Sequence, residues 1–159
     1  MITVIQNHTL QDIIDGARYL LDKGAHSEDV RRLALDISPN GTIAPIYDWV
    51  KEHLSYIPDP VLPDGGFIEL FISPDRMAKD YYAGLQLGED CDGHSLLVTA
   101  LSRSVGLNAN MVLLDISGGG YDHAVSEVFS EQFGEYIMVD TSSNVPLGWY
   151  EANYGRLVI

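Results

Sequence analysis

The sequence predicts an α+β domain in which N-terminal helices precede an antiparallel sheet, with a central, cysteine-bearing helix packed on that sheet. Two observations predict this order. Apolar residues recur at helical spacing over the first third of the chain. After Gly106 they gather into short runs rich in β-branched and aromatic residues, separated by turns. The length of 159 residues fits one domain over 1–159, with a helical part at about 1–57 and a core at about 67–145.

Three helices are expected in the N-terminal part. Thr9 would cap the first, over 10–23, and Gly24 would end it. Ser27 would cap the second, which runs to about residue 36. A break at 38–41 separates it from a third helix at about 43–54. We expect these helices to pack the core.

The middle of the chain changes character several times. Residues 58–66 contain three prolines and two glycines, which favour a loop. Residues 67–72 are apolar and predict a short strand or an extended arm, and a short helix should follow from Ser73 to about Tyr82. We interpret 85–89 as a turn that leads to Cys91.

The last third should supply the long helix and the sheet. The helix is expected over 91–105, with Gly106 ending it. Short strands are predicted at 110–116, 124–129 and 136–139, and 155–159 would add an edge strand. Because short loops join consecutive strands, we expect antiparallel pairing.

Composition excludes several classes of protein. The chain has 9 Lys and Arg against 23 Asp and Glu, a formal net charge of −14, which would repel nucleic acid and anionic membranes. No apolar run reaches the ~18 residues of a spanning helix, and the N-terminus lacks the pattern of a secretory signal. A single cysteine allows no internal disulfide. We therefore expect a cytoplasmic protein, and the sequence makes no prediction of its oligomeric state.

The single cysteine, Cys91, lies where a thiol can become reactive, at the start of the long helix. The helix N-terminus favours the thiolate, whereas Asp90 and Asp92 oppose it. A working thiolate would therefore need an imidazolium beside it. If the second and third strands form a hairpin, His123 and Asp140 become cross-strand neighbours. The sequence thus predicts a nucleophile, a base and an orienting acid.

Four sequence blocks carry a resemblance to a known family: 46–56, the run Asp90-Cys91-Asp92-Gly93-His94, the block 122–128 that begins Asp122-His123, and 136–141 with Asp140. Over about 43–145 the chain resembles the transglutaminase-like superfamily in its bacterial and phage members. The resemblance implies a papain-like fold. It also implies Cys91 as nucleophile, His123 as general base and Asp140 as orienting acid, acting on amides or thioesters through an acyl-enzyme. Glu89 stands where family members often have glycine. Gln86 is a candidate oxyanion donor in the manner of papain-like enzymes.

The function expected is a thiol-dependent hydrolase or acyltransferase that acts on a protein, a peptide or a small amide, without cofactor or metal. A catalytically inactive binding or assembly module with the same fold is the alternative. Cys91 and His94 have the spacing of a zinc-ligand pair, but the second closely spaced pair is missing. Asp90 and Asp92 resemble the start of a calcium loop whose other ligands are absent.

Overall fold

The computed structural model describes residues 1–6, 9–61, 63, 68–149 and 154–159, with the side chains of 5 and 6 excepted. The helices are α1 (Leu10–Ala25), α2 (Glu28–Ile37), α3 (Ile43–His53), α4 (Pro74–Tyr82) and α5 (Cys91–Ser104). The strands are β1 (Ile2–Gln6), β2 (Leu54–Tyr56), β3 (Ile68–Ile72), β4 (Leu87–Glu89), β5 (Ala109–Asp115), β6 (His123–Ser130), β7 (Glu135–Val139) and β8 (Gly155–Val158). The predicted α+β class is confirmed, with the cysteine on a helix and an antiparallel sheet behind it.

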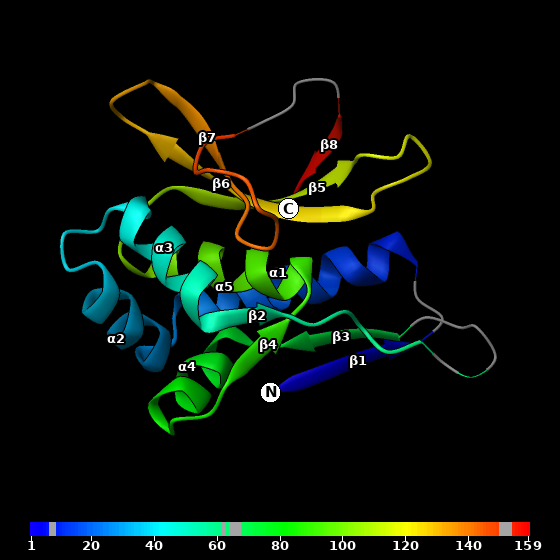
Figure 1. Ribbon diagram of the computed structural model, residues 1–159, viewed down its shortest axis with the longest axis horizontal. Coiled ribbons are helices and arrows are strands. Elements are labelled where there is room, and N and C mark those ends of the chain that lie inside the picture. Colours follow the sequence, from blue (N-terminus) through cyan, green and yellow to red (C-terminus); the bar gives the residue numbers. More distant parts are fainter. Residues whose placement is uncertain (7–8, 62, 64–67, 150–153) are drawn as a thin grey trace.

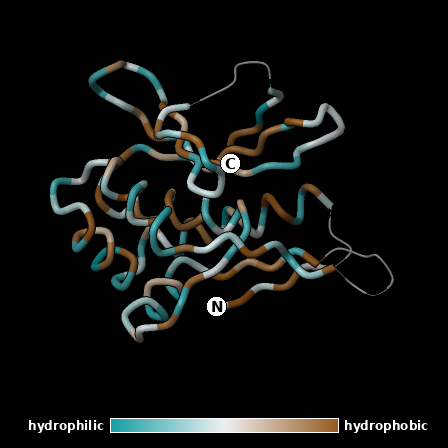
Figure 2. Tube along the Cα trace, in the orientation of Figure 1, coloured by the Kyte–Doolittle hydropathy of each residue, from teal (hydrophilic) through white to brown (hydrophobic). Residues whose placement is uncertain are grey.

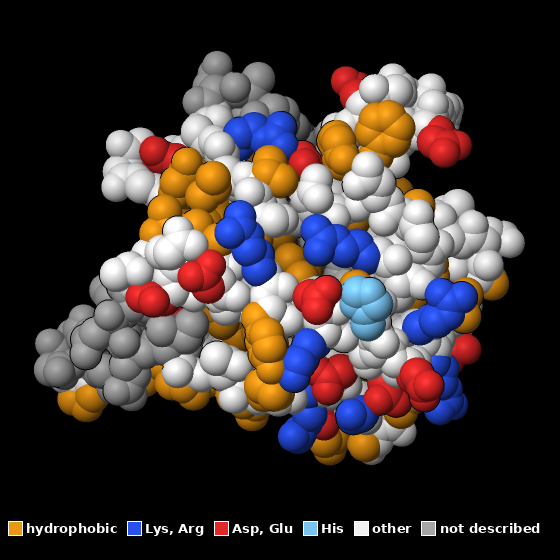
Figure 3. All heavy atoms as spheres, turned by 180° about the vertical axis from the view of Figure 1, so that it is seen from behind, with side chains coloured by type: hydrophobic (Ala, Val, Ile, Leu, Met, Phe, Trp, Pro, Cys, Tyr) orange, Lys and Arg blue, Asp and Glu red, His pale blue; other side chains and the backbone are white. Residues whose placement is uncertain are grey.

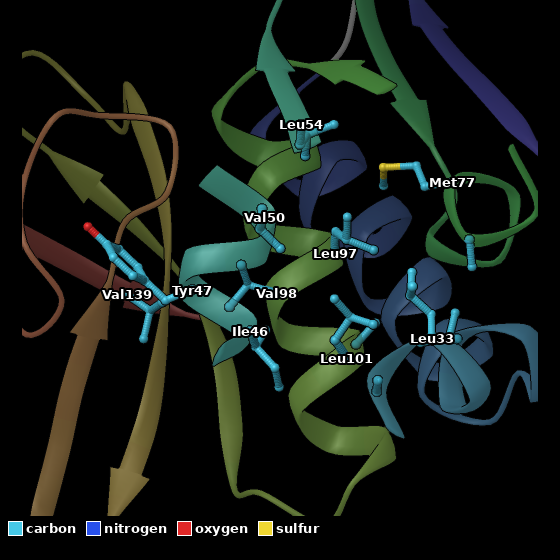
Figure 4. Packing of buried hydrophobic residues seen from close by; sticks show 14 of the residues in the cluster. Leu33, Ile46, Tyr47, Val50, Leu54, Met77, Leu97, Val98, Leu101 and Val139 are labelled. Atoms are coloured by element: carbon cyan, nitrogen blue, oxygen red, sulfur yellow. The ribbon is translucent and has the colours of Figure 1, made fainter. Parts of the chain in front are cut away.

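Helix α5 lies at the centre of the molecule, between the other helices and the four-stranded sheet (Figure 1). Its Leu97, Val98 and Leu101 are fully buried and point among side chains of α2, α3 and α4 (Figure 4). A second cluster joins α5 to α1 and the sheet through Leu20, Leu96 and other buried residues. Hydrophobic and hydrophilic stretches alternate along the helical parts of the trace (Figure 2). Burial of α5 on all sides fixes its N-terminus in space.

The helix starts were predicted well because their caps are local. Thr9 caps α1 in a reciprocal pair with Asp12, whose backbone N–H donates to the Thr9 hydroxyl. The Ser27 side chain likewise accepts from the backbone of Val30 at the start of α2.

The main sheet has the strand order β7-β6-β5-β8, with every pair antiparallel. Strand β8 lies at the edge, as expected for the last residues of the chain. The β6–β7 pairing ends with Ser126 opposite Val139. Continued by one residue, this register sets Asp140 opposite Val125, so His123 is the diagonal neighbour of Asp140.

Two short sheets on the other side of α5 were not predicted from the sequence. Strand β1 pairs antiparallel with β3, and β2 pairs parallel with β4. The predicted turn at 85–89 was therefore wrong for its last three residues, because Leu87–Glu89 pairs with Leu54–Tyr56. The predicted strand at 67–72 is present as Ile68–Ile72, and residue 67 lies outside the described residues. The loop expected at 58–66 is described only at 58–61 and 63.

The surface carries charges of both signs. In the view from behind, basic and acidic side chains alternate over one face (Figure 3). Among the described residues, no helix is long and apolar enough to cross a membrane.

Candidate active site

Cys91 is the first residue of α5 and is half-buried. The residue before it, Asp90, caps the helix by accepting the backbone N–H of Asp92 at 3.2 Å. An aspartate is favoured at this position because the first N–H groups of a helix have no partner within the helix. The thiol therefore lies beside unpaired backbone donors and the positive end of the helix dipole.

His123 and Asp140, predicted as neighbours from the hairpin, form a hydrogen bond. Nε2 of His123 lies 2.9 Å from Oδ2 of Asp140. The other carboxylate oxygen of Asp140 accepts three further bonds, from the backbone and hydroxyl of Ser142 and the backbone of Ser143. Both oxygens of this carboxylate are thus held, which fixes the ring of His123 from one side.

Cys91 and His123 line the same cleft, which has a volume of about 270 Å³. Burial disfavours the charged form of His123. Hydrogen bonds to Asp140 and to Cys91 outweigh it and raise the pKa of His123 to about 10. Burial likewise opposes ionisation of Asp140, but the hydrogen bonds from His123, Ser143 and Ser142 lower its pKa to about 2. The structure therefore brings together all three residues predicted for the site and favours an imidazolium beside the thiol.

A buried set of hydroxyl groups fixes α5 against the strand that carries His123. The Ser95 hydroxyl donates to the carbonyl of Val125 at 2.7 Å, and the Thr99 and Ser126 hydroxyls lie 2.8 Å apart. The Ser126 hydroxyl also donates to the backbone carbonyl of Ser95. These bonds set the position of Cys91 relative to His123, because directional hydrogen bonds fix the register that apolar packing leaves free.

A second link joins α5 to the residue after Asp140. Nδ1 of His94 lies 3.0 Å from the hydroxyl of Thr141, and both side chains are buried. Burial lowers the pKa of His94 to about 4, so its ring is neutral at pH 7. His94 is therefore a positioning residue for α5 and Asp140.

Glu89 is buried and connects β4 with β3 and α5. Its Oε1 accepts the backbone N–H of Ile72 in β3 at 2.7 Å. A methyl group at Gly93 in α5 would overlap the Glu89 side chain, including its Cδ at 2.7 Å. Burial raises the pKa of Glu89 to about 8. The lack of a side chain at Gly93 thus leaves room for the buried Glu89 side chain.

Carboxylates gather around the start of α5 on the side away from Asp140. Oxygens of Asp59, Glu69 and Asp90 lie within 4.8 Å of one another, and so do those of Glu89, Asp90 and Asp92. Burial first, and then the carboxyl groups of Glu69 and Asp90, raise the pKa of Asp92 well above its usual range. The sequence pointed to Asp90 and Asp92 but not to Asp59 and Glu69, because the pairing of β1 with β3 that places Glu69 here involves distant parts of the chain.

The alternative zinc set is not assembled in the described part of the chain. There, each group of potential ligands that could share one ion consists of carboxylates, so Cys91, His94 and His123 do not form such a group.

Gln86 does not reach the cleft. Its side chain is exposed just before β4, and it is not among the described residues that line the cleft. Tyr56 at the end of β2 also lies outside the residues that line the cleft, but it interacts electrostatically with the cysteine. Partial loss of solvent, followed by the negative charge of Cys91 and of Asp90, raises the pKa of Tyr56. The sequence pattern did not predict this interaction, because it depends on the parallel pairing of β2 with β4.

A second pocket, of about 180 Å³, lies on the other side of the His123–Asp140 pair. Val125, Met138 and Trp149 contribute to its mainly apolar lining. His123 therefore separates an acidic cleft, which contains the thiol, from an apolar pocket on the sheet.

Comparison with known proteins supports the fold. No protein-family model matches the chain, and no curated protein sequence is significantly similar to it. The fold is similar to that of a solved structure described as a "putative cysteine protease" from Cytophaga hutchinsonii, with a TM-score of 0.56 and 18% sequence identity. The match covers 92% of this chain and 52% of the other, so this chain spans about half the length of its neighbour. At this level of identity the similarity shows the fold alone.

Proposed function

We propose that the protein is a cysteine hydrolase of amide or peptide bonds, with Cys91 as nucleophile, His123 as general base and Asp140 as orienting acid. The observation that carries the proposal is the position of His123, whose ring interacts with the Cys91 thiol and the Asp140 carboxylate together. A nucleophile, a base and an orienter in this relation define the chemistry of acyl transfer.

The reaction divides into two steps. The Cys91 thiolate attacks the carbonyl carbon, and the C–N bond breaks as His123 gives its proton to the leaving amine. The product is a thioester on Cys91. His123, now neutral, takes a proton from water, the hydroxide oxygen attacks the thioester carbon, and the C–S bond breaks to release the acid and the thiolate. Asp140 keeps the ring oriented throughout and stays ionised.

The developing oxyanion needs donors from the start of α5. The backbone N–H of Cys91 is in the first turn, where helix geometry provides no acceptor.

Alkylation of Cys91 by iodoacetamide tests the thiolate directly, since the chain has one cysteine. With His123 as counter-ion, we expect the rate at pH 6 to stay within about threefold of the rate at pH 8, whereas a free thiol with a pKa near 8.5 slows about tenfold per pH unit. His123→Ala should restore the free-thiol profile. His26→Ala, which alters an exposed histidine, is the matched control and should change nothing.

A free-thiol profile in the wild type would contradict the proposal and favour an inactive binding module. Incubation with a peptide library followed by mass spectrometry then separates hydrolysis from transfer. Hydrolysis gives free carboxyl termini, whereas amine-linked products would indicate an acyltransferase.

A further inference from the structure

We propose that the cleft beside Cys91 selects substrates with a cationic side chain, such as that of lysine or arginine, next to the bond that is cleaved. The inference rests on the proposed function, since it assigns a substrate class to the same site. It concerns the carboxylate-bearing wall, which the hydrolysis mechanism does not use.

Apart from the catalytic histidine, the described ionisable residues of Asp, Glu, Lys, Arg or His type that line the cleft are all acidic. Glu69, Asp90, Asp92 and Asp122 contribute to its lining, and none of its described lining residues is Lys or Arg. A cleft lined by one sign of charge raises the local concentration of the opposite sign by roughly 10- to 1,000-fold. Cationic substrate groups should therefore accumulate beside the thiol, and anionic ones should be excluded.

A buried carboxylate oxygen adds independent support for a bound cation. Asp92 is only 6% exposed, and its Oδ1 has no hydrogen-bond partner among the residues that the structure describes. A buried polar atom without a partner costs free energy, and such atoms are uncommon in native structures. Asp92 also lines the cleft, so a substrate N–H⁺ group bound there would favour the ionised form of this carboxyl, which burial and the neighbouring carboxyl groups of Glu69 and Asp90 now disfavour.

The opposite wall favours an alkyl ammonium or guanidinium over a bare metal ion. Leu10, Ile13 and Leu113 contribute apolar surface to the same cleft. A lysine or arginine side chain has an aliphatic stem and a charged end, and it buries the stem on apolar surface while the charge meets polar groups. A metal ion would contact only the carboxylate oxygens and would make no use of the apolar wall.

Glu69 is the residue through which to test the proposal. It lies in β3, next to Asp92 and away from the His123–Asp140 hydrogen bond. Asp90 and Asp122 are poorer choices because both bind backbone N–H groups, at the start of α5 and in the loop before β6. Glu69→Gln keeps the size of the side chain and removes its charge.

Methanethiosulfonate reagents of three charges measure the selectivity without a known substrate. The Cys91 thiolate attacks the alkylthio sulfur of the reagent, a disulfide forms, and the sulfur–sulfonyl bond breaks to release methanesulfinate. The probes are the trimethylammonium-ethyl, methyl and sulfonatoethyl forms, with N-acetylcysteine as reference thiol. We expect the ratio of cationic to anionic rate at Cys91 to exceed that of the reference at least tenfold. Glu69→Gln should lower the ratio at least threefold, and Glu131→Gln, an exposed acid outside the cleft, should not.

The outcomes separate this inference from the proposed function. A ratio equal to that of the reference, together with iodoacetamide reactivity that depends on His123, would overturn the substrate class and leave the hydrolase intact. A ratio that collapses in micromolar Ca²⁺ or Mg²⁺ would also overturn it, because the carboxylates would then hold a metal ion. Peptides with lysine, norleucine or glutamate beside the cleaved bond give the final readout, and equal kcat/KM for lysine and norleucine would contradict the proposal.

Discussion

Asp140 and Glu89 are two buried carboxylates on opposite sides of Cys91, and the protein treats them in opposite ways. Asp140 accepts bonds on both oxygens, including one from His123, and its pKa falls to about 2. Burial, with a smaller contribution from Asp90, raises the pKa of Glu89 to about 8, and the backbone N–H that Glu89 accepts does not offset this rise. Both are largely removed from water, so burial alone does not decide the charge. Donors and neighbouring charges decide it.

The two sides of the site therefore have different electrostatic effects. The Asp140 side supplies a fixed negative charge that favours the imidazolium of His123. On the other side, the raised pKa values of Glu89 and Asp92 favour their protonated, neutral forms. A thiolate between two flanking aspartates is stable only if the imidazolium, which Asp140 stabilises, outweighs the repulsion from those aspartates at the sulfur.

Asp140→Asn should have the largest effect. The substitution keeps the shape but removes the charge that holds the proton on His123, so the alkylation rate of Cys91 at pH 6 should fall about 100-fold. At pH 9 the loss should be much smaller, because the thiol ionises there without help. Stopped-flow alkylation across this pH range measures both.

Asp48→Asn, which neutralises an exposed aspartate of α3, is the control for net charge. A fall of less than threefold at pH 6 in the Asp140 variant, with a native circular dichroism spectrum, would mean that the dipole of α5 activates the thiol without the dyad.

Glu89→Gln should change stability in a pH-dependent way. Below about pH 4.5 the Glu89 carboxyl is protonated in both the folded and the unfolded chain, so the variant and the wild type should differ little. Between pH 4.5 and 8 only the unfolded chain ionises, and the wild type loses stability that the glutamine variant keeps. The free energy of unfolding of the variant should therefore rise relative to that of the wild type by ~1.4 kcal/mol for each pH unit across this range.

Urea unfolding at pH 2, 3, 4.5, 6 and 8 checks the sign of this change. For Asp140→Asn the sign is reversed. The wild-type advantage is present above about pH 3.8 and is lost as the pH falls through about 2. If the stabilities of the two variants, each relative to the wild type, changed in the same direction with pH, the proposed contrast between Asp140 and Glu89 would be wrong.

The sequence predicted one side of the site much better than the other. His123 and Asp140 lie at the ends of two consecutive strands, so a local hairpin was enough to predict their contact. Tyr56 and Glu69 lie near the cysteine through pairings between distant segments, and a three-residue strand such as Leu87–Glu89 has too few residues to show a periodic pattern. Gln86 was chosen by spacing alone, and spacing does not determine which way a loop side chain points.

Gly93→Ala should have the smallest effect, and it tests the packing that leaves room for the buried Glu89 side chain. The added methyl group would overlap the Glu89 side chain, and overpacking of this kind costs ~1–3 kcal/mol. Replacing glycine by alanine inside a helix stabilises the folded state by up to about 1 kcal/mol, because alanine has the higher helix propensity. We therefore expect a net loss of ~1 kcal/mol in the free energy of unfolding.

The matched control is Gly119→Ala in the β5–β6 loop, where the nearest atom to the new methyl group is the Ser117 hydroxyl oxygen at 3.6 Å. This variant should be neutral. Glu89→Ala should make Gly93→Ala harmless in a double-mutant cycle, because the clash is with the Glu89 side chain itself. If the two substitutions were additive, the overlap would be relieved by a shift of α5. Cys91 would then move relative to His123, and its alkylation rate would fall together with stability.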